Sequence, residues 1–573
     1  MRKIFLNTIL VFLIFSGFAY GALPIVYFSD LTDGVVTGWN QSATKGAAVS
    51  IWGRNFGSSR GSSYVTVGGV SLSHSPDYAE WGAKNNPKTA NELERITFWL
   101  NTDMALGDTT IKVTTPDGTS NAISFYTRNS GHIYFVSPSG NDNNTGLNDT
   151  NQMWATFHKV QLSVNSGDVV YFRNGLWTEV DSGSGSADTI MRLYNGYGDG
   201  YQNGTLHHSI TLASYPNEVA KIGRGLQNEA VNFVYRYTAP NEVGLAYWTF
   251  SKFDINTYST NFCWDASIDN NNDNSLRIVG NAMTTVVPSG NEPMLSIFTN
   301  ATDMRIYGNY MHGAGKVHDS DPHNGSKAKA IYFCGGGISN NVDIGWNEIS
   351  RCDGHSQFFG HFRSDRLDNL KFHDNFVHDQ GQQVIVFGGG DPQADPQYHF
   401  LGQGIKIYNN IFANNMGHVR FANSANGLGG FFEVYNNTFY NNTQSFGHSE
   451  ILLTQYEDSF NFHNNIVDEG PDSSNPQYWY NRPAGYDSAP HSNNETGNHN
   501  LWHGHGAGPA WSTNDWDDIA PQFIVDHPVN YSDFRLKETS PIYNKNVGVQ
   551  IGSFGAPRVS TIGTTMTLIL KDP

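Results

Sequence analysis

The chain has 573 residues, of which 60 are Gly and 22 are Pro, and its formal net charge is −18. With 13% aromatic and 38% hydrophobic residues it is neither collagen-like nor disordered, because it carries enough apolar side chains for a packed core. We expect no nucleic-acid partner, since phosphate binding needs a positive surface and no basic run occurs along the sequence.

The N-terminus has the pattern of an export signal. Arg2 and Lys3 precede an apolar run over 4–18, and small residues follow at Ala19 and Gly21. The run is shorter than the roughly 20 residues that cross a bilayer, so a signal peptide over 1–22 is favoured over a membrane anchor. No later segment is suited to span a membrane, and we therefore expect a secreted or periplasmic bacterial protein.

Three cysteines remain after the signal segment, namely Cys263, Cys334 and Cys352. Because the number is odd, at least one thiol lies outside any intrachain disulfide. A Cys334–Cys352 bridge is one interpretation, and buried thiols are the favoured one, since three cysteines cannot be the main covalent support of so long a secreted chain.

The segment 23–128 predicts a small β-sandwich. Short alternating runs, separated by Gly and Asn turns, predict strands at 48–52, 64–67, 95–100, 109–114 and 122–126. The motifs Val-Ser-Ile-Trp-Gly-Arg-Asn-Phe-Gly at 49–57 and Val-Thr-Val-Gly-Gly-Val at 65–70 resemble an IPT/TIG immunoglobulin-like domain. That resemblance implies a docking or carbohydrate-binding module with Trp81 and Trp99 as sugar-stacking rings. The alternative is a spacer that holds both rings in its core.

The rest of the chain is repetitive. The pattern apolar-x-apolar-x-x-Asn recurs seven times, and its asparagines are Asn281, Asn309, Asn347, Asn375, Asn410, Asn437 and Asn465. The segments are short, alternate with period two and are rich in Phe, Ile, Tyr and Val, so they predict strands and not helices. Short strands at intervals of 27 to 38 residues are typical of the coils of a parallel β-helix. We expect each Asn to tolerate the left-handed turn and to bond the same amide in the next coil.

The ends of this region also fit coils. Strands are predicted at 133–137, 169–173 and 210–212, and 533–536 with 540–544 predict a closing coil. Together these segments resemble the bacterial right-handed parallel β-helix proteins of the pectate-lyase-like superfamily. The resemblance implies an all-β chain with a signal peptide (1–22), an IPT/TIG-like sandwich (23–128) and a β-helix (129–573).

A second strand follows most Asn turns, and its outward residues predict the site. We align 331–334, 358–361, 384–387, 419–422 and 451–454. The position before each strand is expected to face out, which gives the row Ala330, Gln357, Gln383, His418 and Glu450. The next outward row is Tyr332, Phe359, Ile385, Arg420 and Leu452. A carboxylate beside a His raises the His pKa, and Arg supplies a fixed charge for a substrate carboxylate.

The insertion between Asn309 and Asn347 is ten residues longer than the 28-residue coils and is rich in ionisable groups. Long loops on a rigid scaffold are common places for sites. Lys316 or Lys329 is a candidate base, and Asp319 with Asp321 is a candidate Ca²⁺ site. The predicted catalytic residues are His418, Arg420, Lys329, Glu450 and His361, and the predicted substrate-binding residues are Lys316, His355, Arg363, Gln383 and Tyr332.

Three functions follow from this interpretation. The first is a polysaccharide lyase, in which a cation neutralises a uronate carboxylate and a Lys or His removes a proton. The second is a glycoside hydrolase, which needs two carboxylates at a set separation. The third is a non-catalytic glycan-binding surface protein. In each case the expected partner is an extended polysaccharide, and we expect a monomer.

Overall fold

The computed structural model describes residues 22–85, 87–178, 189–194, 202–223, 232–238, 244–257, 262–266, 272–285, 293–297, 300–314, 329–333, 338–352, 356–358, 366–381, 384–387, 402–422, 431–442, 450–454, 459–471, 479–481, 495–504, 506–549 and 551. The predicted signal peptide therefore lies outside the described residues, apart from Ala22. In the part of the chain that the structure describes, every helix is too short or too polar to span a bilayer.

The N-terminal segment is a sandwich of two β-sheets around one apolar core. One sheet contains β1 (Ile25–Ser29), β3 (Lys45–Arg54), β7 (Glu94–Asn101) and β6 (Tyr78–Ala83). The other contains β2 (Asp33–Val35), β10 (Ile123–Arg128), β8 (Gly107–Thr115), β4 (Tyr64–Val67) and β5 (Val70–Leu72), with β9 (Gly118–Thr119) beside β8. Short 3₁₀ turns lie at η1 (Trp39–Gln41), η2 (Ser75–Asp77) and η3 (Ala90–Glu92). All five strands predicted here are confirmed.

The two tryptophans singled out in the sandwich pack within it. Both rings lie against its core. Trp81 Nε1 donates to the Phe56 carbonyl at 2.9 Å, and Lys45 Nζ lies 3.4 Å from the centre of the Trp99 ring. Both rings are half-buried, so their packing leaves the spacer and the sugar-stacking interpretations open.

The remainder of the chain is a parallel β-helix, so the protein is all-β. Among the described residues, sheet 1 contains β11 (Ile133–Val136), β12 (Val169–Phe172), β15 (Ile210–Ser214), β18 (Trp248–Ser251), β22 (Arg277–Val279), β26 (Arg305–Tyr307), β30 (Asp343–Gly345), β34 (Lys371–His373), β37 (Ile405–Tyr408), β40 (Phe431–Tyr435), β43 (Ser459–His463), β46 (Glu495–Asn498) and β48 (Ser512–Thr513). Sheet 2 contains β13 (Gly175–Trp177), β16 (Ala220–Ile222), β19 (Asp254–Thr257), β23 (Ala282–Thr285), β27 (Tyr310–Ala314), β31 (Glu348–Cys352), β35 (Phe376–His378), β38 (Ile411–Ala413), β41 (Thr438–Tyr440), β44 (Ile466–Asp468), β47 (Leu501–His503) and β49 (Trp516–Asp517).

Sheet 3 completes each coil. It contains β14 (Thr189–Tyr194), β17 (Asn232–Thr238), β20 (Phe262–Ala266), β24 (Leu295–Ile297), β28 (Ile331–Phe333), β32 (Ser356–Phe358), β36 (Ile385–Phe387), β39 (Val419–Ala422), β42 (Ile451–Thr454) and β45 (Trp479–Asn481). A small fourth sheet contains β21 (Asn272–Asn274), β25 (Asn300–Thr302), β29 (Ile338–Asn340) and β33 (Arg366–Asp368). The apolar side chains of sheets 1 to 3 meet in one continuous core along the solenoid.

The predicted Asn ladder is confirmed. All seven asparagines are fully buried in the turn between sheets 1 and 2. Asn347 is typical: its Oδ1 accepts from the backbone N and Nδ2 of Asn309, and its Nδ2 donates to Asn375 Oδ1 at 3.0 Å. Each rung satisfies polar groups that the turn would otherwise bury without partners.

The left-handed residue of this turn is not the ladder Asn, which corrects the sequence interpretation. The positive φ belongs to the residue before it, as in Trp346 (φ 58°), Asp374 (φ 53°) and Asn409 (φ 55°). The two positions have different roles. The left-handed residue turns the chain, and the next residue, the ladder Asn, then points its side-chain amide into the solenoid.

The first coils of the solenoid and the segment after its last coil are built differently. At the first coils, α1 (Phe157–Ser163) places Phe157 and Val160 in the solenoid core, and the Thr156 hydroxyl caps the helix by accepting from Lys159 N at 3.0 Å. The predicted closing coil at 533–544 is wrong. Residues 531–534 form the 3₁₀ turn η4 (Tyr531–Phe534), and the segment 519–549 runs along the outside of sheet 2. Its apolar side chains cover those of Phe376, Ile411, Tyr440, Ile466 and Leu501.

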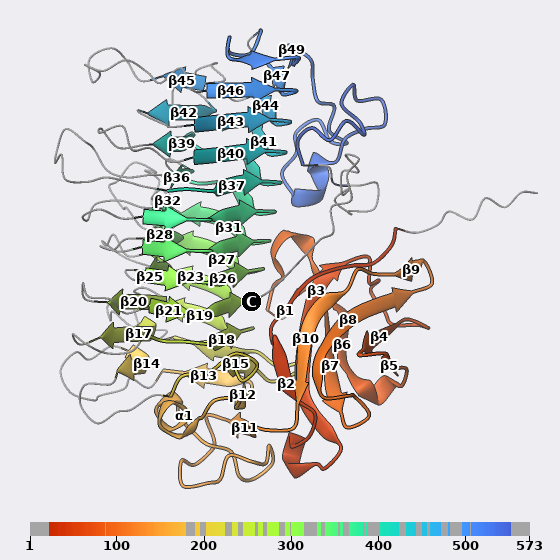
Figure 1. Cartoon of the computed structure of the whole chain (residues 1–573), viewed down its shortest axis with the longest axis vertical. Coiled ribbons are helices and arrows are strands. Elements are labelled where there is room, and N and C mark those ends of the chain that lie inside the picture. The colour runs from red at the N-terminus through yellow and green to blue at the C-terminus, as the bar shows by residue number, and fades with distance from the viewer. Residues whose placement is uncertain are drawn as a thin grey trace, which may run out of the picture.

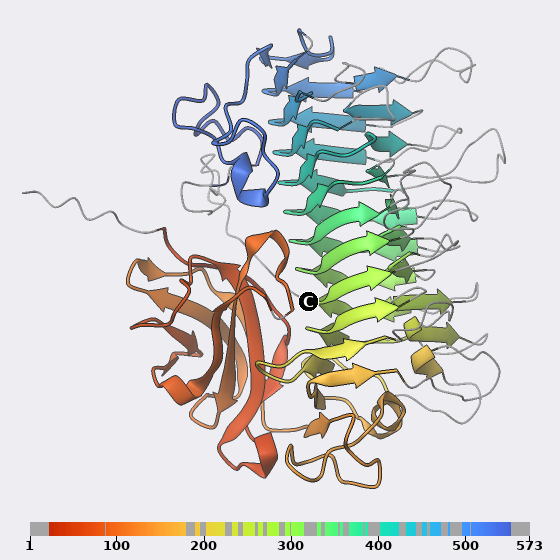
Figure 2. The ribbon, with the colours of Figure 1, turned by 180° about the vertical axis from the view of Figure 1, so that it is seen from behind.

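The sandwich lies against the solenoid. Side chains of sheet 1, among them Phe135 and Tyr171, belong to the same apolar cluster as the sandwich core. Figures 1 and 2 show the sandwich and the C-terminal segment on one side of the solenoid and the strands of sheet 3 on the other. The sandwich thus covers part of sheet 1, and the C-terminal segment covers part of sheet 2.

Candidate active site

A row of residue positions runs in register along sheet 3. Strand pairing joins Arg192, Tyr235, Cys263, Ser296, Tyr332, Gln357, Val386, Arg420, Leu452 and Tyr480. The neighbours of Tyr332 on β28, Ile331 and Phe333, are buried in the solenoid core. Because side chains alternate along a strand, Tyr332 lies on the outer face of sheet 3, where it is half-buried, and Ser296, one coil earlier, is 2% exposed. Adjacent members are about 4.8 Å apart, so the row suits an extended polymer.

The predicted row is correct at three coils and wrong at two. Tyr332, Arg420 and Leu452 hold the expected positions, whereas Gln357 and Val386 replace the predicted Phe359 and Ile385. Ile385 is fully buried in the core. A strand of three residues is too short for alternation to fix its register, and one residue of slip exchanges the two faces.

Lys329 and Tyr332 lie together at the edge of this row. Lys329 Nζ is 4.4 Å from the centre of the Tyr332 ring, and both side chains are half-buried. The backbone carbonyl of Lys329 accepts from Met294 N at 2.8 Å in the neighbouring coil. The Tyr332 ring and the backbone bond to Met294 therefore orient the long, flexible side chain of Lys329.

His418 and Glu450 are not on the solvent face, contrary to the sequence interpretation. Their side chains are 6% and 1% exposed, and Ala330, at the corresponding position of β28, is fully buried. His418 is joined to the neighbouring coils through its strand: its carbonyl accepts from Val384 N at 3.1 Å, and Val419 N donates to the Glu450 carbonyl at 3.2 Å.

Glu450 ends a second ladder, which the sequence analysis missed. Gln380, Asn415 and Asn442 follow strands of sheet 2, and each occupies the turn toward sheet 3. Asn442 donates from its backbone N to Glu450 Oε1 at 2.8 Å and from Nδ2 to Oε2 at 2.6 Å. Burial raises the pKa of Glu450 well above its ordinary value, although the bonds from Asn442 oppose that change. The sequence signal that could have predicted this ladder is a pair of polar residues after a strand of sheet 2, such as Asn414-Asn415. The first residue of the pair has positive φ.

The other predicted site residues lie outside the described residues. They are Lys316, Asp319, Asp321, His355, His361, Arg363 and Gln383. Within the described residues, no three His, Cys, Asp or Glu side chains lie close enough together to bind a metal ion.

No family model matches the sequence, and no curated relative matches it. Among solved structures, the chain is similar to a pectate lyase, at 13% identity and a TM-score of 0.43, over 72% of this chain and 91% of that one. It is also similar to a rhamnogalacturonan lyase, at 14% identity and a TM-score of 0.33, over 75% of this chain and 89% of that one. A third is the A-module of a mannuronan C-5 epimerase from Azotobacter vinelandii, at 11% identity and a TM-score of 0.29, over 55% of this chain and 91% of that one. The strand pairing of the chain itself, and not these likenesses, defines the fold.

Proposed function

We propose that the protein is a secreted polysaccharide lyase that cleaves a uronate-containing glycan by β-elimination, with the glycan lying along the outer row of sheet 3. The observation that carries the proposal is the in-register row that includes Tyr332 and the backbone position of Arg420. These two positions are three coils apart, about 14 Å at the usual strand spacing, which matches a ligand of several sugar units.

The residue types of this row suit the chemistry. Elimination requires that a base removes the proton beside the uronate carboxylate, that the electron pair forms a C=C bond, and that the glycosidic oxygen leaves and takes up a proton. In our proposal Lys329 is the base that removes this proton, and Tyr332 orients Lys329 and contacts the sugar. Asp319 and Asp321 are the residues that we propose for a Ca²⁺ ion, which would neutralise the carboxylate of the unit that loses its proton. Arg420, about 14 Å farther along the row, binds the carboxylate of another uronate unit of the same glycan, and His418, which precedes the strand of Arg420, positions that strand.

Glu450 has no part in the proposed chemistry. Its two oxygens accept from Asn442 inside the solenoid, so it is not available as one of the two carboxylates that a glycoside hydrolase needs. A hydrolase mechanism of this chain would therefore have to use two other carboxylates.

The test incubates the purified mature protein with pectate, alginate, ulvan and glycosaminoglycans, with and without Ca²⁺, and follows the ultraviolet absorbance of unsaturated uronate. We expect a rise on at least one polymer. New reducing ends without that absorbance would indicate hydrolysis, and binding without chain shortening would indicate a surface glycan-binding protein; either result would overturn the proposal.

A further inference from the structure

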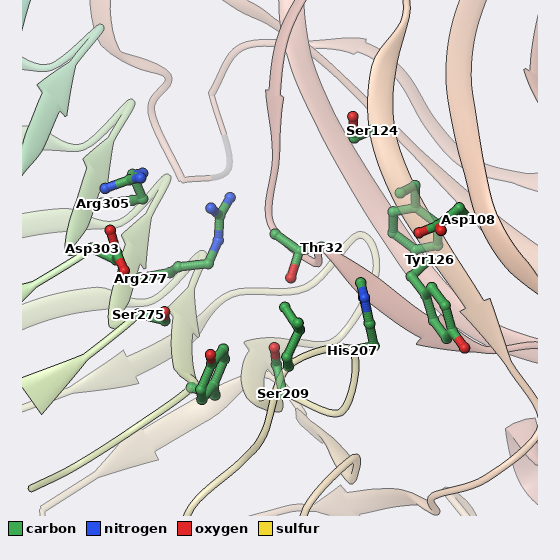
Figure 3. Close-up of a pocket in the computed structure, with 13 residues that line it drawn as sticks. Thr32, Asp108, Ser124, Tyr126, His207, Ser209, Ser275, Arg277, Asp303 and Arg305 are labelled. Atoms are coloured by element: carbon green, nitrogen blue, oxygen red, sulfur yellow. The ribbon is translucent and has the colours of Figure 1, made fainter. Parts of the chain in front are cut away.

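A cavity lies between the sandwich and the solenoid, on the side opposite the row of sheet 3. It has a volume of about 220 Å³. Ligand pockets for drug-sized molecules begin at roughly 300 Å³, so this cavity suits one sugar ring or a group of that size. Figure 3 shows Arg277, Arg305, Asp303 and Ser275 on the solenoid side, and Ser124, Tyr126 and Asp108 on the sandwich side, with Thr32 between them.

Two arginines from successive coils form its basic wall. Arg277 of β22 pairs in register with Arg305 of β26, and both side chains are more than nine-tenths buried. Arg277 Nη2 donates to the Ser29 carbonyl at 2.8 Å, and Arg305 Nη1 donates to the Asn341 carbonyl at 2.6 Å. These bonds fix both guanidinium groups at the cavity. Asp303 lies on the same wall, so this wall offers guanidinium donors to a carboxylate and a carboxylate acceptor to sugar hydroxyls.

The rest of the lining consists mainly of hydroxyls and rings, together with the carboxylates of Asp108 and Asp303. The hydroxyl side chains of Thr32, Ser124, Ser209 and Ser275 line it, together with the rings of Tyr126, His207 and Tyr247. The rings of Tyr126 in the sandwich and His207 in the solenoid domain stack, with their centres 4.1 Å apart, so the two domains are in contact at the cavity. A hydroxyl can both donate to and accept from a hydroxyl of a sugar. The planar guanidinium group of Arg can donate two parallel hydrogen bonds to one carboxylate.

We propose that this cavity binds a single uronic-acid unit, with the carboxylate at Arg277 and Arg305 and the ring hydroxyls at the Ser and Thr side chains. The site is separate from the row of sheet 3 and does not depend on the proposed function. It lies where the sandwich meets the solenoid, so a bound uronate contacts both and gives the sandwich a direct role in holding a glycan chain end or a released monosaccharide.

Two variants at one exposed position test the charge of the site without disturbing the core. Ser124 is exposed on β10 and lines the cavity. Ser124→Glu adds a negative charge and Ser124→Lys adds a positive one, with side chains of similar length. For a carboxylate ligand we expect Ser124→Glu to weaken binding and Ser124→Lys to leave it equal or stronger. Arg305→Gln removes one guanidinium and should weaken binding about tenfold or more, since hydrogen bonds to charged groups are the strong ones.

The measurement is calorimetric titration and saturation-transfer NMR on the full mature chain. The probes are D-galacturonate, D-glucuronate and D-mannuronate, with the matching neutral hexoses and inorganic sulfate as controls. We expect at least one uronate to bind more tightly than its neutral hexose and than sulfate, with the charge dependence given above, and to do so unchanged in an Arg420→Gln variant.

Three results would overturn the proposal. Sulfate that binds as tightly as the uronates would show a simple anion site, neutral hexoses that bind equally would remove the role of the carboxylate, and no binding would leave the arginines structural. Loss of lyase activity with intact uronate binding would count against the proposed function alone, so the two failures are distinguishable.

Discussion

Lys252 of the solenoid and Asp30 of the sandwich form a buried ion pair, with 3.2 Å between Nζ and Oδ2 and side-chain exposures of only 4% and 0%. Lys252 Nζ also donates to Ser50 Oγ at 2.7 Å, and Asp30 Oδ1 accepts from the backbone N of Leu31 and of Ser50. The pair crosses the boundary between the two domains, so the sandwich is held in one position on the solenoid.

Removing one member of this pair should destabilise the whole chain. Lys252→Met leaves the Asp30 carboxylate buried without its cation, which typically costs about 3–5 kcal/mol. We expect a large fall in the denaturant midpoint, whereas Lys221→Met, at an exposed lysine of β16, should change little. Equal midpoints for the two variants would show that the domain boundary contributes little to stability.

The middle of the Asn ladder should be equally sensitive. Asn347→Ala deletes the bonds to Asn309, Asn375 and the Ile306 carbonyl and leaves buried polar groups without partners, at about 1–3 kcal/mol for each group. Thermal unfolding should therefore occur at a clearly lower temperature. The matched control is Asn143→Ala, at an exposed asparagine, which should unfold like the unsubstituted protein. A ladder variant that unfolds like this control would contradict the structural role.

His373 should make stability depend on pH in the alkaline range. Burial lowers its pKa, but the carboxylates of Asp343 and Asp374 outweigh burial and raise the pKa to about 9. Nε2 lies 2.7 Å from Asp343 Oδ1, and Nδ1 lies 2.8 Å from Asp374 Oδ2. A raised pKa in the folded state stabilises the fold below the ordinary value of 6.5, and that contribution is lost as the pH rises through about 9.

We expect the melting temperature to fall between pH 6.5 and pH 9, and to fall less in His373→Gln. The carboxyl of Asp343, the partner of His373, affects stability in the acidic range instead. Burial raises its pKa, but His373 outweighs this and lowers it to about 2, so its contribution is lost only as the pH falls from 3.8 toward 2. Parallel pH profiles for the unsubstituted protein and His373→Gln would rule out this role of the imidazole.

Glu450→Gln separates a structural role from a catalytic one. The structure makes Glu450 the last member of a buried ladder, so the variant should keep its turnover. Gln offers only one acceptor oxygen to the two N–H groups of Asn442, so stability should fall by about 1 kcal/mol. Activity on the best substrate and the denaturant midpoint are measured together. A near-complete loss of turnover in a folded Glu450→Gln protein would restore the carboxylate to the active site.

The solenoid was predictable because its signal is long and repeated. Seven asparagines, at intervals of 27 to 38 residues, mark one turn of each coil, and the bonds between Asn309, Asn347 and Asn375 explain why Asn recurs there. The strands of sheet 2 were not predicted, because pieces of three residues such as Ile411–Ala413 are buried throughout and show no alternation. The segment 533–536 alternates like a strand, but Phe534 and Leu536 use that alternation to pack on the outside of sheet 2.

The candidate site was only partly predictable, for a physical reason. Polar residues before a strand were taken to face solvent, and Glu450 shows why this rule fails: a partner at Asn442 allows a carboxyl group to lie inside the coil. The cavity at Arg277 and Arg305 left no sequence signal, because it forms only where the sandwich meets sheet 1.

The most direct test of the central claim compares two Arg→Gln variants in different sheets of the solenoid. Arg420 holds an outer-row position of sheet 3, and Arg351 is an exposed residue of β31 in sheet 2. On the polymer that gives unsaturated product, we expect Arg420→Gln to lower kcat/KM by about tenfold or more, because hydrogen bonds to charged groups are the strong ones, and Arg351→Gln to leave it unchanged. Full activity in folded Arg420→Gln protein, or an equal loss in both variants, would contradict the assignment of the active site to sheet 3.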